Sequence, residues 1–524
     1  MATYRNTCQS LIGLILWFAA VFINTSHTGA QALKKPNILV IYTDDHRYSG
    51  VHTLGGEAVQ TPNLDQLAQE GVAFTNAYLQ GAFTGATCIP SRAMLLTGRN
   101  LFELGPRQGR VIPSDHHTMG EIFKDAGYYT YHIGKWHNDM KSLARSFDDG
   151  AKVSGMPAYL TDQFRMPFSD WNASGNYRKE DCYLLEYDDN GTVIRRALTA
   201  EDKRGPIGTE ATGPHVSEVL ADEAVSFFTN YTKEDPFFTY LAFPTPHDPR
   251  QAPQRYKDLY PEEEIDLPPS YGSQHPFDNG HIYLRDERLA PWPRTVDIAR
   301  QHLSDYYAII THLDAQIGRV VAALKASGLY ENTLIVMAGD SGLGVGNHGL
   351  LGKQNIYDED GIHIPLIFSG GLIEESSSRI DALVYNFDIL PTLCELAGLE
   401  IPESVTGKSL ASVISGESSS VRDYTYHAYR QHQRAVRHGA YKLIEYVRAP
   451  VAKSYDREAH IAGSRVTQLF KLTEDPWETF NLADFPEYEE KVKEMRRLMK
   501  TAATEFADVP DPMRSETDFW AYYD

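Results

Sequence analysis

The sequence is organised around one stretch, Thr87-Cys88-Ile89-Pro90-Ser91-Arg92-Ala93-Met94-Leu95-Leu96-Thr97-Gly98-Arg99. Pro90 suits the first turn of a helix, good helix formers follow it, and Gly98 is a natural helix end. The stretch therefore predicts a helix that begins at Cys88, with Arg92 one turn further along the same face. An anion beside Cys88 would meet unpaired N–H groups, the positive end of the helix dipole and the charge of Arg92. The alternative is a buried cysteine ahead of an ordinary helix.

Apolar runs that predict buried strands recur along the chain, and polar residues come directly after them. The pairs of run and polar group are 37–43 with Asp44 and Asp45, 128–133 with Lys135 and His137, 237–243 with His247, and 333–339 with Asp340. Nearly continuous apolar runs are typical of parallel strands that are buried on both faces. In an open sheet, ligands bind outside the carboxyl ends of such strands. The sequence therefore predicts that these groups converge at one edge of a sheet.

Amphipathic helices alternate with these strands, at residues 216–229 and 296–327 among others. The pattern predicts an α/β fold with a large mixed, mostly parallel sheet covered by helices on both faces. Residues 440–446 and 468–472 then predict strands, and 488–503 a charged helix. We therefore expect a smaller C-terminal α+β subdomain, an antiparallel sheet plus helix. The expected division is a catalytic domain at 33–410 and this subdomain at 411–524.

The N-terminus carries an apolar run, Leu11 to Ile23, after Arg5, and small residues end it at Ala30-Gln31-Ala32. This is the pattern of a secretory signal peptide that is cleaved after Ala32. The run is too short for a comfortable membrane span, and no later stretch offers roughly 20 uninterrupted apolar residues. We expect residues 1–32 to be removed and the mature protein to be secreted or periplasmic, with no membrane span.

The formal net charge of −21 and the pI near 5.3 argue against nucleic acid as a partner. Cations that converge on one pocket still allow a local anion site. Removal of the signal peptide leaves Cys88, Cys182 and Cys394. A disulfide between Cys182 and Cys394 is compatible with an oxidising compartment, but the sequence does not establish it.

Cys88, Pro90 and Arg92 match the Cys-x-Pro-x-Arg signature of the formylglycine-dependent sulfatases, and Thr97-Gly98-Arg99 matches its usual continuation. The chain resembles this family from its first mature strand almost to its end. Ile89 departs from the small residue that is more common in the family. The resemblance implies that a formylglycine-generating maturation enzyme oxidises Cys88 to 3-oxoalanine, an aldehyde that hydrates to a geminal diol.

The resemblance also implies a calcium site. Asp44-Asp45 matches the Asp-Asp pair after the family's first strand, and Asp340 maps onto another calcium ligand. The side chain of Cys88, once oxidised, is expected to contact the same calcium ion. Without the resemblance, Asp44-Asp45 is either a turn with helix-capping potential, which the residues favour, or half of a metal site. Ser341 stands where the family carries His or Asn. A hydroxyl coordinates calcium more weakly than an amide oxygen, so ligation by Ser341 and by a water in its place both stay open.

The remaining site residues take their expected roles from the same resemblance. Gly134-Lys135-Trp136-His137, the Pro246-His247 element and His348-Gly349 with Gly352-Lys353 match family elements. Calcium would polarise a sulfate oxygen and one diol hydroxyl, while Lys135 and Lys353 hold the sulfate and Arg92 steadies the diol and the carboxylates. His247, alone or with Lys353, protonates the leaving alcohol, and His137 helps to remove the proton of the second hydroxyl. A solvated lysine and a core histidine are the alternative for Lys135 and His137.

The implied function is the hydrolysis of sulfate esters on a sulfated carbohydrate, although no residue names a sugar. One alternative is a formylglycine-dependent phosphodiesterase or phosphonate monoester hydrolase, because the same site can process tetrahedral phosphorus. Another is a catalytically silent sulfated-glycan-binding protein. Residues 141–213 have little regular pattern, and we expect substrate-recognition loops there. Tyr429, Arg430 and Arg434 are compatible both with a place over the active-site mouth and with a solvated surface.

Overall fold

The computed structural model describes residues 34–105, 107–158, 162–199, 201–202, 212–373, 378–448, 464–508 and 519–523. Lys35–Asp524 form one compact unit. The predicted signal peptide, residues 1–32, lies outside the described residues, and the division at residue 410 stays a prediction. In the ranges that are described, no helix combines the length and apolar character needed to cross a membrane.

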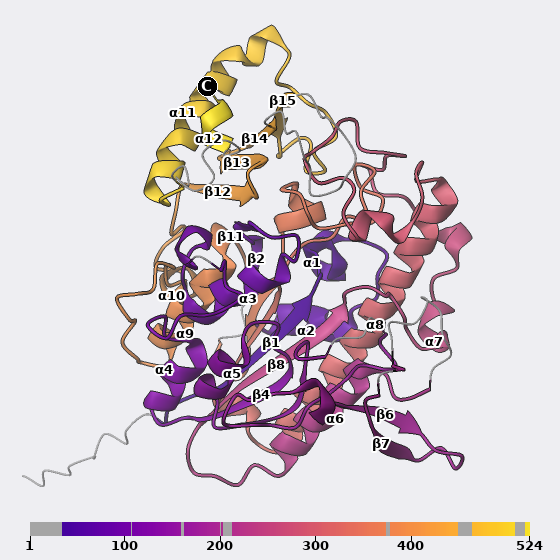
Figure 1. Cartoon of the computed structure of the whole chain (residues 1–524). Coiled ribbons are helices and arrows are strands. Elements are labelled where there is room, and N and C mark those ends of the chain that lie inside the picture. The colour runs from indigo at the N-terminus through magenta and orange to yellow at the C-terminus, as the bar shows by residue number, and fades with distance from the viewer. Residues whose placement is uncertain are drawn as a thin grey trace, which may run out of the picture. The chain divides into compact units, whose positions relative to one another are not determined.

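A sheet of eight strands forms the centre of the unit (Figure 1). In spatial order its strands are β11 (Ser378–Tyr385), β2 (Val72–Tyr78), β10 (Leu366–Ser369), β9 (Thr333–Gly339), β1 (Asn37–Asp44), β8 (Phe237–Pro246), β4 (Tyr129–Lys135) and β5 (Asp149–Ser154). All neighbours pair in parallel except β10, which is antiparallel to both β2 and β9. The predicted mixed, mostly parallel sheet is confirmed.

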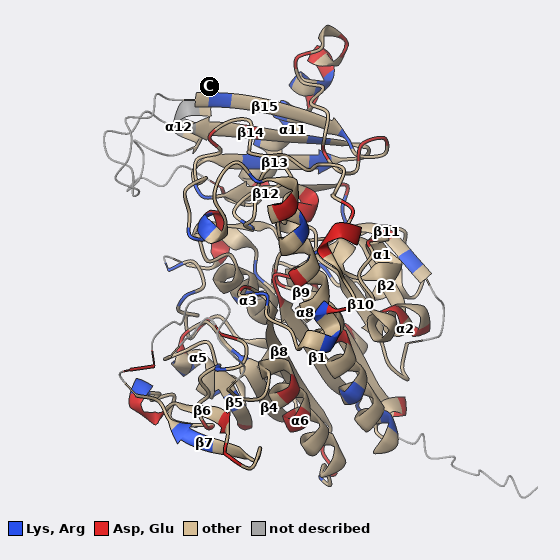
Figure 2. Cartoon of the chain, turned by 90° about the vertical axis from the view of Figure 1, so that its right-hand side faces the viewer, with Lys and Arg blue, Asp and Glu red and all other residues tan. Residues whose placement is uncertain are grey.

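Helices cover both faces of this sheet. Alternate residues of its strands point to opposite sides, so each face has its own hydrophobic core against which helices pack. In β1, Ile38, Val40 and Tyr42 belong to one hydrophobic core, and Leu39 and Ile41 belong to the other. The first core includes residues of α3 (Cys88–Thr97), α4 (Met119–Asp125), α5 (Met140–Ser146) and α9 (Ile389–Leu396). The second includes residues of α2 (Pro62–Glu70), α6 (Val216–Thr229) and α8 (Val296–Ala326). In Figure 2 the charged residues colour α6 and α8, whereas the central strands are mostly tan.

A second sheet lies in the C-terminal part of the chain, with strand order β15 (Ser464–Lys471), β14 (Tyr441–Arg448), β13 (Gln433–His438), β12 (Tyr424–Tyr429) and β3 (Gly81–Ala82). The predicted antiparallel sheet is present, with β14 and β15 at the two predicted strands and β12 and β13 in addition to them, and α11 (Glu489–Glu505) packs on it through Met495 and Met499. The sequence did not predict β3. This two-residue strand pairs in parallel with β12 and ties the sheet to the segment before Cys88.

The other described elements are short. They include the hairpin of β6 (Tyr183–Tyr187) and β7 (Val193–Ala197), and the helices α1 (His52–Gly55), α7 (Gln254–Lys257), α10 (Ala411–Ile414) and α12 (Phe519–Tyr523). Cys182 and Cys394 are both buried and free, so the structure contains no disulfide between them. The Sγ of Cys182 lies 3.3 Å from the Ser169 hydroxyl, whereas Cys394 belongs to the main hydrophobic core.

Gly81→Ala is expected to lower the free energy of unfolding by about 3 kcal/mol. Gly81 has a φ of 131°, and an added Cβ would lie 1.8 Å from the carbonyl oxygen of Ala428 in β12. Urea unfolding measures the change. Gly191→Ala is the control, because Gly191 also has a positive φ (75°) but its Cβ would meet open space. Equal losses in the two variants would show that the β3–β12 contact adds nothing.

Candidate active site

Cys88 is the first residue of α3, which begins and ends as its sequence predicts. Gly98 follows the helix in the left-handed conformation, with a φ of 63°, and donates its N–H to the carbonyl oxygen of Met94. The Cys88 side chain is buried, and its Sγ lies 3.1 Å from Nδ1 of His137. Burial raises the pKa of the Cys88 thiol to about 11, although nearby lysines oppose the shift. An unmodified thiol here is protonated at neutral pH and is a poor nucleophile.

Three buried carboxylates gather at the carboxyl ends of two neighbouring strands. Asp44 is the last residue of β1, and Asp45 follows it with a φ of 62°. Asp340 comes directly after β9, and its Oδ1 accepts the backbone N–H of Asp45 at 2.9 Å. Because β1 and β9 pair in parallel, both strands deliver their acids to the same edge of the sheet.

Each of these carboxylates has a buried basic partner, namely Lys135 at Asp44, Lys353 at Asp45, and Arg92 at Asp340 with a distance of 3.1 Å. Burial raises the pKa of Asp340 to about 7, and the charge of Asp44 adds to this shift. Burial acts in the same direction on Asp44, but Lys135 and the other cations outweigh it and hold its pKa well below the usual range. Asp44 is therefore held as an anion.

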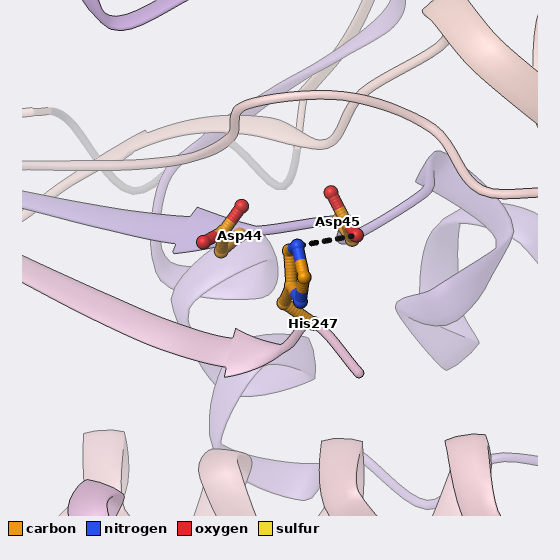
Figure 3. A group of neighbouring side chains, drawn as sticks. All are labelled: Asp44, Asp45 and His247. Atoms are coloured by element: carbon orange, nitrogen blue, oxygen red, sulfur yellow. Dashed lines mark ion pairs between the residues drawn. The ribbon is translucent and has the colours of Figure 1, made fainter. Parts of the chain in front are cut away.

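His247 comes directly after β8 and faces the carboxylates. Its Nδ1 lies 2.7 Å from the carbonyl oxygen of Asp248, and its Nε2 lies 3.8 Å from Oδ2 of Asp45. Figure 3 shows the ring beside Asp44 and Asp45, with its contact to Asp45 drawn as a dashed line. Because a carbonyl oxygen can only accept, Nδ1 carries a proton, and Nε2 is the atom available for proton exchange with a bound molecule.

The oxygen atoms at this edge of the sheet fit a divalent cation. Two groups each bring their ligand atoms within 4.8 Å of one another, Asp44 with Asp45 and His247, and Asp44 with Cys88 and Asp340. Oδ1 of Asp44 is buried, and no described group donates a hydrogen bond to it. The Ser341 hydroxyl lies 3.2 Å from Oδ1 of Asp45 and 3.4 Å from Oδ1 of Asp340. Ca²⁺ prefers such carboxylate and hydroxyl oxygens, so the residues present suit it.

A cavity of about 520 Å³ opens onto these groups. Its buried lining residues are Cys88, His247, His281, Asp286 and Lys353, and its partly or fully exposed ones are His137, 83–86, Leu284, Arg285 and Arg430. Pockets that enclose small ligands measure about 300–1,000 Å³, so the cavity has room for more than a sulfate group. The residues at its mouth come from three separate segments.

The sequence analysis did not predict most of the residues that line the mouth of the cavity. No described residue of 141–213 lines the cavity, where substrate-recognition loops were expected. Gln163 of that segment supports the site instead, because its Nε2 donates to the carbonyl oxygen of His247 at 2.8 Å. Of the three residues left open, Arg430 lines the cavity, Tyr429 is buried and bonds His281, and Arg434 pairs with Asp508. Neither periodicity nor a motif marks the 281–286 segment.

Lys135 and His137 both reach the site, although they do not lie on one extended strand. Two residues apart on an extended strand would share one side. β4 instead ends at Lys135, with a register shift after Ile133, and His137 has a φ of 70°. The turn sends Lys135 to Asp44 and the His137 ring to Cys88. Both side chains face the site, as expected, because the chain turns after Lys135.

The sequence of this chain matches the family model "Sulfatase" over residues 36–399. The chain belongs to the sulfatase family. A second model, "N-sulphoglucosamine sulphohydrolase, C-terminal", matches residues 346–505. The protein is therefore a sulfuric ester hydrolase, and the two matches together extend over almost all of the compact unit.

Characterised sulfatases align with this one over most of its length. An arylsulfatase from Clostridium perfringens is 28% identical over 480 residues, which cover 89% of this chain and 94% of the relative. An ulvan-active sulfatase from Formosa agariphila is 29% identical over 488 residues, 90% of this chain and 82% of the relative. The similarity therefore includes both sheets.

Solved structures share the fold of this sulfatase. One, described as bound to its substrate D-glucosamine-2-N,6-O-disulfate, has a TM-score of 0.65 at 23% identity, over 91% of this chain and 99% of its own. A phosphonate monoester hydrolase from Silicibacter pomeroyi has a TM-score of 0.64 at 22% identity, over 90% and 96%. At these identities the likeness extends to the fold alone.

Glu287 supports the loop that carries Lys353 in this sulfatase, and sequence reasoning missed it. Its buried carboxylate accepts the backbone N–H groups of Leu351, at 3.0 Å, and Gly352, at 2.9 Å. The same carboxylate accepts a hydrogen bond of 3.1 Å from Arg294, whose side chain is also buried. Glu287 is therefore a positioning residue for Lys353.

Glu287→Ala is expected to lower the free energy of unfolding by about 3–5 kcal/mol, because it leaves a buried charge and two N–H groups without their acceptor. Urea unfolding gives the change in stability, and kcat/KM for an aryl sulfate reports the displacement of Lys353. Glu263→Ala, at an exposed glutamate of a short 3₁₀ helix, is the matched control. Identical unfolding midpoints for the two variants would contradict the role of Glu287.

Proposed function

We propose that this sulfatase hydrolyses sulfate esters of a sulfated carbohydrate, with Cys88 oxidised to formylglycine and Ca²⁺ bound at the carboxylates. One observation carries the proposal: a carboxylate oxygen of Asp44, a carboxylate oxygen of Asp340 and Sγ of Cys88 all lie within 4.8 Å of one another. His137 adds a proton acceptor 3.1 Å from Sγ of Cys88. Acids, cations and the side chain to be oxidised thus share one buried site.

The carbohydrate part of the proposal draws on the relatives and on the cavity. The Formosa agariphila relative is named for activity on ulvan, and the solved neighbour holds a sulfated glucosamine. The cavity extends beyond Cys88 to a partly exposed mouth, and its volume of about 520 Å³ has room for a sugar ring. The maturation enzyme, export after cleavage at Ala32 and the domain division at residue 410 are further parts of the proposal.

The roles of the metal and of residue 88 follow from their chemistry. Ca²⁺, when bound by Asp44, Asp45 and Asp340, supplies a Lewis acid for a sulfate oxygen, and Ser341 lies within reach of the same oxygens. The diol form of residue 88 supplies an attacking hydroxyl and a second hydroxyl that allows sulfate to leave. Arg92 holds Asp340 in place at 3.1 Å and lies 3.9 Å from Asp44.

The lysines and histidines bind the ester and move protons. Lys135 and Lys353 place their ammonium groups at the carboxylates, where a sulfate beside residue 88 meets two positive charges. In its doubly protonated form, His247 is positioned to protonate the leaving alcohol from Nε2, since the Nδ1 proton is engaged with the Asp248 carbonyl. Nδ1 of His137 is positioned to take the proton of the second hydroxyl, and burial holds the pKa of His137 well below its usual value, so the ring is neutral.

Comparing kcat/KM for 4-nitrophenyl sulfate with that for bis(4-nitrophenyl) phosphate tests the reaction. The proposal predicts a preference for the sulfate ester in protein that carries formylglycine. A preference for the phosphodiester would favour a phosphodiesterase or phosphonate monoester hydrolase, the alternative suggested by the Silicibacter pomeroyi neighbour. Turnover of neither ester and no release of sulfate from sulfated saccharides, with binding of sulfated glycans retained, would identify a silent binding protein.

A further inference from the structure

Arg430 is a cation at the mouth of the active-site cavity, and no acidic side chain among the described residues forms an ion pair with it. It lines the cavity together with Cys88 and Lys353. Within the described residues, the one side-chain hydrogen bond of its guanidinium joins Nη1 to Nε2 of His281, at 2.9 Å. Its Nε–H is buried without a described acceptor.

His281 does not neutralise this charge. Arg430 can only donate, so Nε2 of His281 accepts, and the ring proton resides on Nδ1, which lies 2.6 Å from the hydroxyl of Tyr429. The imidazole is therefore neutral in this arrangement. It orients the guanidinium and leaves its positive charge to the cavity.

The acids near the mouth are occupied by other groups. Both oxygens of Asp248 accept from Arg285, at 2.7 and 3.0 Å. Asp286 accepts from Arg285 at 2.7 Å through one oxygen and from Gln354 at 2.6 Å through the other. Lys353, the third cation on the cavity wall, pairs with Asp45. Arg430 is left as the cation with no acidic partner among the described residues.

The backbone holds Arg430 firmly in this place. It follows β12 with a φ of 45°, a conformation that is uncommon for residues other than glycine. Its N–H donates to the carbonyl oxygen of Ala82 in β3 at 2.7 Å, and its own carbonyl oxygen accepts from Arg434 at 2.6 Å. Because β3 leads directly into the 83–88 segment, the hairpin tip and the Cys88 segment are fixed to each other.

We propose that Arg430 binds a second anionic group of the substrate, a carboxylate or a second sulfate on the sugar that carries the ester or on its neighbour. This inference rests on the proposed function, since it takes the ester to lie at residue 88. A guanidinium forms paired hydrogen bonds with either anion, and a neutral sugar would leave the charge and the buried Nε–H unsatisfied. The substrate is therefore a saccharide with at least two acidic groups.

Titration calorimetry on the Cys88→Ala variant tests the proposal with uncleaved ligands. Two ligand pairs separate the two anions, glucosamine 6-sulfate with and without a 2-N-sulfate, and a sulfated disaccharide whose uronic acid is free or methyl-esterified. In at least one pair, the member with the additional anion is expected to bind about 10- to 100-fold more tightly. Adding Arg430→Met should reduce that preference to about twofold or less, and the pair that responds identifies the anion.

Two further variants distinguish binding from folding. Arg430→Lys should retain part of the preference, because it keeps the charge and loses the planar fork. Arg288→Met, at an exposed arginine outside the cavity lining, should retain all of it. Thermal unfolding checks that each variant is folded.

Three results would overturn the proposal: equal affinity for the members of both pairs, a preference that survives Arg430→Met, or no measurable binding of any of the four ligands. These results are independent of the sulfatase reaction, which turnover of 4-nitrophenyl sulfate by the wild-type protein measures separately.

Discussion

Replacing Cys88 by serine is expected to lower kcat for 4-nitrophenyl sulfate by at least about 10⁴-fold, in line with the loss of an enzyme's covalent nucleophile. A serine that stays unoxidised has one hydroxyl, which gives no second oxygen to expel sulfate. Steady-state turnover should therefore stop after at most one sulfate per chain. The measurement is a quenched-flow assay followed by mass analysis of the protein, which should detect sulfated serine if attack occurs.

Cys182→Ala is the matched control for this variant. Cys182 is also buried and free, but it packs beside Ser169 and not at the carboxylates. It should keep the kcat of the wild-type protein. A Cys88→Ser protein whose serine is unoxidised by mass analysis, and that turns over repeatedly within about tenfold of the wild-type rate, would contradict a role for oxidised residue 88.

Replacing Asp44 by asparagine is expected to lower kcat/KM by about 10³-fold and to abolish stabilisation by Ca²⁺. Asp44 belongs to both candidate ligand groups, and its Oδ1 has no described hydrogen-bond donor. The substitution also removes the carboxylate that Lys135 contacts, so the metal-free variant should lose about 3–5 kcal/mol of unfolding free energy. Equilibrium dialysis with Ca²⁺ and thermal unfolding in EGTA and in Ca²⁺ measure both effects.

Asp189→Asn, at an exposed aspartate, controls for the change in net charge. The wild-type protein and this control should bind one Ca²⁺ at the site and melt at a higher temperature in its presence, because a ligand that binds the folded state stabilises it. Full wild-type activity after exhaustive chelation, together with an unchanged melting temperature, would contradict the calcium site.

The parts of the fold that the sequence predicts best are those with strong local patterns. The bounds predicted for α6 (216–229) and β9 (333–339) agree with the structure, and α8 differs by one residue at its end. These elements carry long apolar runs or a clear amphipathic period, and each is buried as its pattern indicates. The same patterns placed Asp44 and Asp340 at strand ends on one edge of the sheet, and the structure adds that their strands are neighbours.

The parts that escaped prediction depend on contacts between distant segments. Gly81–Ala82 is too short to show a strand pattern, yet its pairing with β12 fixes Arg430 at the cavity. Glu287 supports the Lys353 loop only because the chain folds back over it. The positive φ of His137 likewise has no signal in its neighbours. Local pattern predicts elements, whereas these residues are defined by tertiary packing.

The mass of the tryptic peptide that spans residues 48–92, taken from a preparation of known specific activity, tests the central claim most directly. If oxidised residue 88 is the nucleophile, the peptide carries an aldehyde or its hydrate at that position, in a fraction that rises with specific activity across preparations. An unmodified Cys88 thiol throughout a fully active preparation would contradict the account.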